Sequence, residues 1–386
     1  MKIINLSSIA NPISISVQNP SRSDYDRFIG LEHYDSGEPV ITRFQGTELL
    51  TTSAKAFKAN DILIARRNVY LKRAGIVFFD GITSGDSIIL RLKEDTQKTI
   101  GYSREDLIRY IPFMLNSEHF WIYANKHADG MNSKRISKDT LLEYEFELPS
   151  IDEMRDISDK LWAAYRLKEA YKKLLVTTDE MVKSQFIEMF GNPFEINSEV
   201  VPLSSLCSIN PSKPKGLDDS LSVSFIPMDR ISEDGEYAEF ETKPLKDVKK
   251  GFTYCAEDDV LFAKITPCME NGKGAILKGL SNGIGFGSTE FHVLRPILGI
   301  SNSEWLYFLT KLNGFRIDAA KNMTGTGGQK RVPSSYLLNF KVLKPQLEVQ
   351  REFAKIVHQA DKSKSVIQKA LVYLNDIQSD ELGKIA

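Results

Sequence analysis

The chain contains a long internal repeat. Residues 134–155 recur as residues 330–351 without a gap, at a constant offset of 196 residues that relates Arg135 to Arg331. Shorter segments of the first half also recur in the second half, residues 6–12 as 203–211 and residues 61–66 as 259–264. A period close to half the chain predicts two copies of one domain, because the units of a solenoid are far shorter. Two copies of a binding domain suggest a ligand with two parts, which the two copies bind with pseudo-two-fold symmetry.

Each half begins with short apolar runs that are separated by turn signals. Apolar runs of this length between turn residues predict β-strands. The expected strands cover residues 62–65, 74–79 and 87–90 in the first half, and residues 260–263, 274–277 and 291–294 in the second. A helical stretch follows in each half, around residues 105–123 and 303–320. The sequence therefore predicts two mixed α/β domains.

A long amphipathic helix is expected after each of these domains. Residues 152–190 contain no Gly or Pro, and their apolar residues recur at steps of three, four and seven. Such a helix would be about 60 Å long at 1.5 Å per residue, and Gly191-Asn192-Pro193 would end it. A second helix is expected from Glu348 to the chain end. Helices of this length cannot bury an apolar stripe in a small domain, which favours an antiparallel coiled coil.

Two lysines interrupt the apolar seam of these helices, Lys168 and Lys364. Two unrelated surface helices are therefore the alternative to a coiled coil. The expected fold class is α+β, with two homologous recognition domains separated by two long antiparallel helices. The expected boundaries are 1–150 and 192–345 for the domains, and 151–191 and 346–386 for the helices.

Composition limits the class of protein. The formal net charge is −1 and the charges are not segregated between the halves, so a nucleic-acid surface would require clustering of cations on one face. The three cysteines, Cys207, Cys255 and Cys268, lie in one half, which argues against a disulfide framework and favours the cytoplasm. We expect neither a secretion signal nor a membrane span, because no apolar run reaches 18 residues.

The second copy carries several segments that are characteristic of one family. They are residues 262–273 (FAKITPCMENGK), 287–296 (GSTEFHVLRP), 325–333 (GTGGQKRVP) and 344–351 (KPQLEVQR), together with residues 186–193 at the end of the first long helix. With the two-domain plan, they resemble the specificity subunit of type I restriction-modification enzymes. The first copy departs from this pattern at residues 66–73 and 129–134, as expected if the copies read different sequences.

The resemblance implies partners and cofactors. Double-stranded DNA would be the ligand, and two methyltransferase subunits would dock on the chain. Restriction subunits could join them. S-adenosylmethionine would be bound by the methyltransferase partner, and ATP and Mg by the restriction partner. No cofactor is expected on this chain.

The candidate DNA-binding residues of the first copy are basic. Arg66, Arg67, Lys72 and Arg73 place four cations in eight residues directly after an expected strand, and Lys134 is the first residue of the repeated segment. Arginine can bind a guanine edge with two hydrogen bonds, and both Lys and Arg neutralise phosphates. A solvated basic loop is the alternative interpretation.

The candidate DNA-binding residues of the second copy lie in two loops. Lys264, Thr266 and Lys273 form the set equivalent to the basic loop of the first copy. The glycine-rich loop adds Gly327, Gly328, Gln329 and Lys330. Glycines allow the backbone to approach a nucleic-acid strand, and glutamine can read adenine. A simple turn is the alternative.

Catalysis by this chain is not expected. Asp229 with Glu241 and Lys243 imitates a nuclease pattern only at a loose spacing, and the histidines do not combine with cysteines at a metal-ligand spacing. We expect no catalytic residue and no metal site. A fused methyltransferase or nuclease, and a two-domain protein-binding scaffold, are the alternatives to a DNA-specificity subunit.

Phe186, Met189 and Phe190 are the candidate partner-binding residues. They lie just before the expected end of the first long helix, where a partner helix could dock. With Trp162, they are expected to be exposed apolar positions that make the isolated chain poorly soluble. The alternative is that they close against the second recognition domain.

Overall fold

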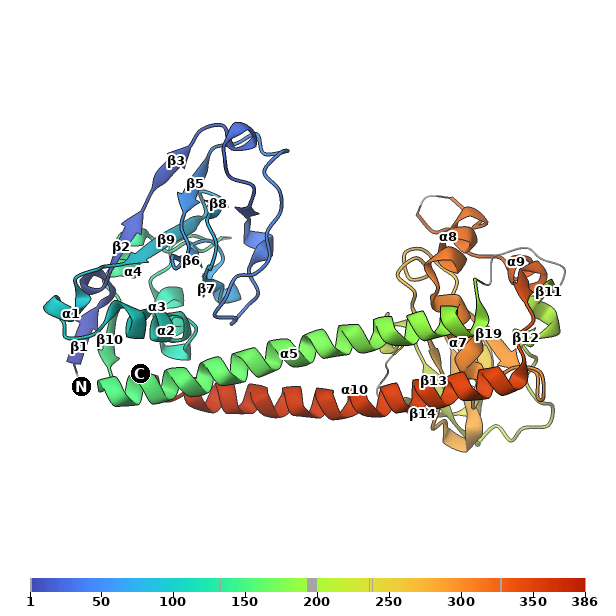
Figure 1. Ribbon diagram of the computed structural model, residues 1–386. Helices are drawn as coiled ribbons and strands as arrows, with labels where there is room; N and C mark the ends of the chain where they lie inside the picture. The colour runs from blue at the N-terminus through green and yellow to red at the C-terminus, as the bar shows by residue number, and fades with distance from the viewer. Residues whose placement is uncertain are drawn as a thin grey trace. The chain divides into compact units, whose positions relative to one another are not determined.

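The computed structural model describes residues 2–131, 133–192, 200–235, 237, 239–326 and 328–385 (Figure 1). The chain divides into two compact units. The first contains Met1–Lys172 and Gln368–Ala386, and the second contains Lys173–Ile367. Both units are mixtures of helices and sheets. Two long helices, α5 (Ile151–Phe190) and α10 (Leu347–Leu382), contribute residues to each of them.

The first unit contains two four-stranded sheets among its described residues. One has the order β2-β9-β6-β7 and is antiparallel. The other has the order β3-β5-β8-β4, in which β4 and β8 are parallel, and β1 pairs separately with β10. The strands are β1 (Lys2–Asn5), β2 (Ala10–Ile13), β3 (Ile15–Val17), β4 (Phe28–Ile29), β5 (Ala54–Phe57), β6 (Ile62–Ala65), β7 (Ala74–Ile76), β8 (Gly81–Thr83), β9 (Ser87–Leu92) and β10 (Glu145–Leu148).

The second unit is built in a similar way. Its sheets have the orders β12-β19-β16-β17 and β14-β13-β18-β15, and β11 pairs with β20. The strands are β11 (Val200–Pro202), β12 (Cys207–Ile209), β13 (Ser222–Ile226), β14 (Glu241–Pro244), β15 (Thr253–Ala256), β16 (Val260–Ala263), β17 (Gly274–Ile276), β18 (Ile284–Gly287), β19 (Phe291–Pro296) and β20 (Lys341–Leu343).

The two units differ in one strand of the second sheet. The strands β5-β8-β4 correspond to β15-β18-β13, and each set includes one parallel pair. The fourth strand lies on opposite edges, because β3 pairs with β5 whereas β14 pairs with β13. The repeated topology is therefore strongest in the first sheet, which carries the loops discussed below.

The single helical stretch that the sequence predicts in each half is observed as two helices. The expected stretch 105–123 is α2 (Arg104–Met114) followed by α3 (Glu118–Lys126), and Ser117 begins the second by accepting a 3.3 Å hydrogen bond from Phe120 N. The remaining helices that the structure describes are α1 (Thr96–Thr99), α4 (Lys138–Leu142), α6 (Leu245–Val248), α7 (Ser303–Lys311), α8 (Asn313–Lys321) and α9 (Ser334–Asn339).

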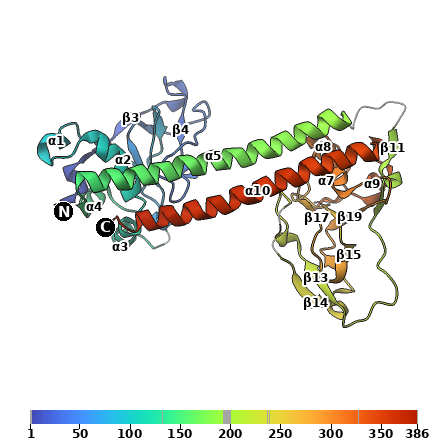
Figure 2. The same cartoon turned by 60° about the horizontal axis from the view of Figure 1, so that its bottom comes forward.

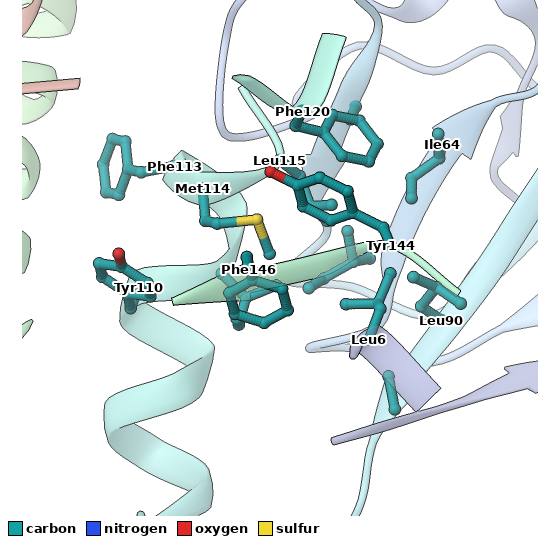
Figure 3. Packing of buried hydrophobic residues seen from close by; sticks show 14 of the residues in the cluster. Leu6, Ile64, Leu90, Tyr110, Phe113, Met114, Leu115, Phe120, Tyr144 and Phe146 are labelled. Carbon is teal, nitrogen blue, oxygen red and sulfur yellow. The ribbon is translucent and has the colours of Figure 1, made fainter. Parts of the chain in front are cut away.

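The core of the first unit lies between its first sheet and its helices. Figure 3 shows Ile64 and Leu90 of the sheet together with Met114 and Phe120 from the helical side, with Tyr144 between them. All of these side chains are buried. The strand β6 is buried along its whole length, as expected for a continuous apolar run.

The core of the second unit joins α7 to the two long helices. Trp305 and Phe315 pack there with Phe186 of α5 and Phe353 of α10. Within this unit, α7 and α9 lie next to α10, whereas β13 and β14 lie farther from it (Figure 2). The long helix α10 is therefore anchored to the second unit through the helical layer.

The helices α5 and α10 contact each other inside each unit. In the first unit, Lys168 donates a 3.3 Å hydrogen bond to Gln378 and forms a 3.0 Å ion pair with Glu38. In the second unit, Lys364 forms a 2.9 Å ion pair with Asp179. The two lysines that interrupt the apolar seam are thus satisfied by polar partners. Across the described ranges, no helix is long and apolar enough to cross a membrane.

Candidate nucleic-acid interface

In the first copy, the loop that follows β6 is joined to the segment that precedes α4. The backbone N–H of Asn68 donates a 2.7 Å hydrogen bond to Lys134 O, and that of Ile136 donates a 3.0 Å bond to Arg66 O. Residues 66–73 and 134 therefore lie together, although they are far apart in the sequence. These hydrogen bonds join the two segments that carry the five candidate DNA-binding residues of the first copy.

The second copy has the same arrangement after β16. Thr266 N donates a 3.0 Å hydrogen bond to Lys330 O, and Val332 N donates a 2.9 Å bond to Lys264 O. Lys264, Thr266 and Lys273 are thereby joined to the loop that carries Gly328, Gln329 and Lys330. Gly327 lies outside the described residues.

An acidic residue that the sequence interpretation missed supports each loop pair. Arg331 donates hydrogen bonds of 2.9 and 2.8 Å from Nε and Nη2 to the Glu290 carboxylate. The Arg331 guanidinium holds the pKa of Glu290 below its usual value. In the first copy, Arg67 and Arg135 lie 3.8 and 3.7 Å from the Asp86 carboxylate. The sequence offered one indication of these acidic partners: Arg135 and Arg331 occupy the same position of the repeat, so that each could be expected to have a similar partner.

Arg73 and Lys273 bond to the backbone at equivalent turns. Arg73 Nη1 donates a 2.9 Å hydrogen bond to Leu31 O, and Lys273 Nζ donates a 3.3 Å bond to Met228 O. Burial lowers the pKa of Arg73. In this structure, both side chains fasten a loop to a neighbouring turn, in addition to any contact that they make with a ligand.

Two other candidates are also engaged within the protein. Arg67 Nε donates a 2.8 Å hydrogen bond to Ser133 Oγ. Thr266 Oγ1 donates to Glu270 Oε1 at 3.1 Å. A base contact by either side chain would therefore replace or share an existing hydrogen bond.

The remaining candidates face solvent to different extents. Arg66 and Lys264 are half-buried, whereas Lys72, Lys134, Gly328, Gln329 and Lys330 are exposed. Within the described ranges, the ammonium groups of Lys72, Lys134 and Lys330 have no ion pair or hydrogen bond. They can neutralise phosphates without first breaking an internal bond. Tyr70 and Leu71, which the sequence interpretation did not select, expose apolar surface beside Lys72.

The expectation that Phe186, Met189 and Phe190 are exposed is wrong. Phe186 is fully buried, and its ring lies 5.3 Å from that of Phe353. Phe190 packs against Phe353 and Trp305, and Met189 is partly buried against the same core. The alternative expectation, closure against the second half of the chain, agrees with the observed packing within the second unit.

Trp162 is also not an exposed apolar position. Its ring packs 5.0 Å from that of Phe113, and its Nε1 donates a 2.9 Å hydrogen bond to Arg109 O. The helix face that carries it is covered by α2 of the first unit. Because Phe186 and Trp162 are buried, they give no reason to expect that the isolated chain is poorly soluble.

The polar groups of the described residues do not assemble a metal site. Within these ranges, no group of three or more His, Cys, Asp or Glu side chains could hold a metal ion. Lys243 pairs with Glu241 at 3.4 Å and lies 4.0 Å from the centre of the Phe225 ring. The three cysteines are free, and burial raises the pKa of Cys207 to about 12.

Comparisons with known proteins identify part of the chain. Residues 195–372 match the family model of the type I restriction modification DNA specificity domain. The chain is 46% identical over 162 residues to the type I restriction enzyme EcoAI specificity subunit of Escherichia coli, and 40% identical over 177 residues to the EcoEI specificity subunit of the same organism. These alignments cover 41% and 44% of this chain, but only 27% and 30% of the relatives.

A solved structure has a similar fold over nearly the whole chain. The type I restriction-modification system S subunit from M. genitalium matches with a TM-score of 0.57, covering 99% of this chain and 95% of that one at 13% identity. The fold is therefore shared well beyond the region of clear sequence similarity. Residues 195–372 are therefore similar to the type I restriction modification DNA specificity domain, and the fold of nearly the whole chain is similar to that of the M. genitalium S subunit.

Proposed function

We propose that this chain is the DNA sequence-specificity subunit of a type I restriction-modification complex. Each copy would read one half of a bipartite, asymmetric duplex target. The observation that carries the proposal is the pair of loops after β6 and β16, each joined by the same backbone hydrogen bonds to a second loop. The framework is repeated while the loop sequences differ, which suits two readers of different half-sites.

The exposed cations supply the affinity in this proposal. Lys72 and Lys134 in the first copy, and Lys330 in the second, would neutralise phosphates, which contributes affinity without sequence information. Gln329 and the half-buried cations Arg66 and Lys264 would contact base edges. Arg67, Thr266, Arg73 and Lys273 would shape the loops and contact DNA from their bonded positions.

The long helices would separate the two readers. The contacts of Lys168 with Gln378 and of Lys364 with Asp179 support an antiparallel coiled coil with pseudo-two-fold symmetry. Such a coiled coil would set the gap between half-sites. The domains would then cover residues 1–150 and 192–345, with helical spacers at 151–191 and 346–386.

Enzymatic activities would belong to partner chains in the cytoplasm. Two methyltransferase subunits would supply S-adenosylmethionine-dependent methylation, and restriction subunits would supply ATP- and Mg-dependent cleavage. This chain would direct them to the target and would bind no cofactor itself.

The proposal is tested by expressing the full chain with its methyltransferase and selecting duplexes from a randomised pool. We expect two short conserved half-sites at a fixed gap, with binding that weakens steeply as salt increases. Replacing Lys264 and Gln329 with Ala should relax only one half-site, with losses of about 1–3 kcal/mol per base contact.

The matched variant replaces Arg66 and Lys72 with Ala and should affect only the other half-site. Equal relaxation at both half-sites from either variant would contradict independent readers. A chain that binds the methyltransferase but selects no duplex would be a protein scaffold, and the proposed function would be wrong.

A further inference from the structure

Lys311 connects two segments of the second copy that are separate in the sequence. We call residues 264–273 the reader loop and residues 228–235 the companion segment. Lys311, the last residue of α7, donates a 3.1 Å hydrogen bond from Nζ to Gly272 O in the reader loop. The same ammonium group donates to Glu233 O in the companion segment.

Other side chains join the same two segments. Asn271 Nδ2 donates a 2.6 Å hydrogen bond to Glu233 Oε1, and Lys273 bonds to Met228 O as described above. Tyr307, one turn before Lys311 on α7, donates a 3.1 Å bond to Asp234 O. The reader loop and the companion segment are therefore bonded both to each other and to α7.

Glycines allow the close approach to the helices. Gly235 and Gly272 both have positive φ values, of 84° and 77°. A Cβ at Gly235 would collide with Tyr307 Oη, and a Cβ at Gly272 would collide with Nη1 of Arg316 on α8. Glycine is therefore favoured at both points, because a positive φ strains other residues and because a Cβ would displace the Tyr307 or Arg316 side chain.

The first copy makes only part of this arrangement. Arg73 bonds to Leu31 O as Lys273 bonds to Met228 O. Just beyond the end of α2, Asn116 Nδ2 donates a 2.9 Å hydrogen bond to Ala74 O, at the start of β7. This contact is made by a neutral amide and not by an ammonium group. Among the described residues, the bridge through a half-buried ammonium group is thus a feature of the second copy.

Burial of the Lys311 ammonium has a cost. Transfer of a charged group out of water is unfavourable unless hydrogen bonds compensate for it, and burial accordingly lowers the pKa of Lys311 to about 8. The two backbone carbonyls provide part of that compensation. Removing the ammonium group should therefore release the two segments from each other more than it should weaken the surrounding core.

We propose that Lys311 is a positioning residue that holds the reader loop and the companion segment together as one surface, and that this surface sets the sequence preference of the second copy. The exposed Asp229 and Arg230 of the companion segment then belong to the DNA-facing surface. This inference rests on the proposed function, which it extends from single loops to a composite surface.

Hydrogen–deuterium exchange of the full chain tests the positioning role without DNA. In Lys311→Met, exchange should rise at least about fivefold in peptides that cover residues 228–235 and 264–273, because local opening becomes less costly. Exchange in β16 and β19 should stay unchanged. Lys311→Arg retains the donors and should restore most of the protection.

Two further variants complete this first test. Lys321→Met is the matched control, because this exposed lysine ends the next helix, α8, and it should change neither segment. Asn271→Ala removes an exposed cross-link and provides a second test if Lys311→Met does not fold. Unchanged exchange in both segments, in either folded variant, would overturn the positioning role.

Duplex selection by the same full-length variants, bound to the methyltransferase, tests the link to recognition. Lys311→Met should reduce the base preference at one half-site by about tenfold, corresponding to one lost base contact, and should leave the other half-site and the gap unchanged. Faster exchange with an unaltered half-site would overturn the role in recognition. Failure of the wild type to select any duplex would instead overturn the proposed function, while the exchange experiment would still decide the positioning role.

Discussion

Arg295 and Asp259 form an ion pair with two hydrogen bonds, both 2.7 Å long. The Asp259 carboxylate is fully buried and also accepts a 2.7 Å hydrogen bond from Ala256 N. Arg91 and Asp61 form the equivalent pair in the first copy, again with two bonds of 2.7 Å. The Arg91–Asp61 pair joins β9 to the start of β6, and the Arg295–Asp259 pair joins β19 to the start of β16. Each of β6 and β16 leads into a candidate DNA-binding loop.

We expect Arg295→Met to destabilise the second unit by about 3 kcal/mol. Loss of one partner of a buried ion pair usually costs about 3–5 kcal/mol. We expect the lower value here because Arg295 is partly exposed, so that water can partly solvate the Asp259 carboxylate that remains. Urea unfolding of the full chain measures the change. The double variant Arg295→Met with Asp259→Asn removes the unpaired buried charge and should recover part of the loss. A double variant that is less stable than Arg295→Met would contradict the explanation.

Substitutions at adjacent residues of α5 should have very different effects. Phe186 is fully buried, whereas Ile187 is 42% exposed. Phe186→Ala should therefore lower the free energy of unfolding by about 3–5 kcal/mol through loss of core packing. Ile187→Ala should change it by no more than about 0.5 kcal/mol. Thermal and urea unfolding of both variants provide the comparison, and similar losses would contradict the observed burial.

The stability contributed by Lys311 should depend on pH. Its pKa is lowered to about 8, mainly by burial and then by Arg316, and Lys183 acts in the same direction while Asp234 and Asp179 oppose it. The unfolded chain keeps the ordinary value of 10.5 and binds more protons between these values, so stability rises with pH in that window. Compared with Lys311→Met, the wild type should gain stability from about pH 8 towards 10.5. A constant difference would contradict the lowered pKa.

A change in the length of the spacer should alter the gap and not the half-sites. We expect four residues inserted near Thr177 in α5 to add about 6 Å of helix. This corresponds to about two base pairs of duplex at 3.4 Å each. Sequencing of methylated bases in cells that express the variant with the methyltransferase would reveal the new gap. Altered half-sites at the original gap would contradict a spacer role.

The sequence predicted well those features that depend on local pattern. The absence of Gly and Pro from residues 152–190 predicted a helix whose observed range is Ile151–Phe190. The apolar runs at 62–65 and 260–263 predicted strands that are observed with these bounds. The paired loops were also predictable as candidates, because a repeat with divergent loops indicates a common framework with variable binding residues.

Two features could not be predicted from the sequence, because they depend on contacts between residues that are distant in the chain. Phe186 and Phe190 have the spacing of an exposed helix stripe, but Phe353 and Trp305 cover them. Arg73 and Lys273 have the composition of phosphate ligands, but their side chains bond to backbone carbonyls at residues 31 and 228. Neither partner is visible in a local pattern.

The sequence by itself determined the long helices and the buried strands, because helix periodicity, apolar runs and turn residues are local patterns. Only the tertiary structure decided which side chains of the candidate loops remain free. Lys72 and Lys330 extend from the surface, whereas Lys311 is drawn inward by carbonyls from segments about 40 and 80 residues away. The physical reason is that a buried hydrogen bond is set by where distant segments meet in the folded chain.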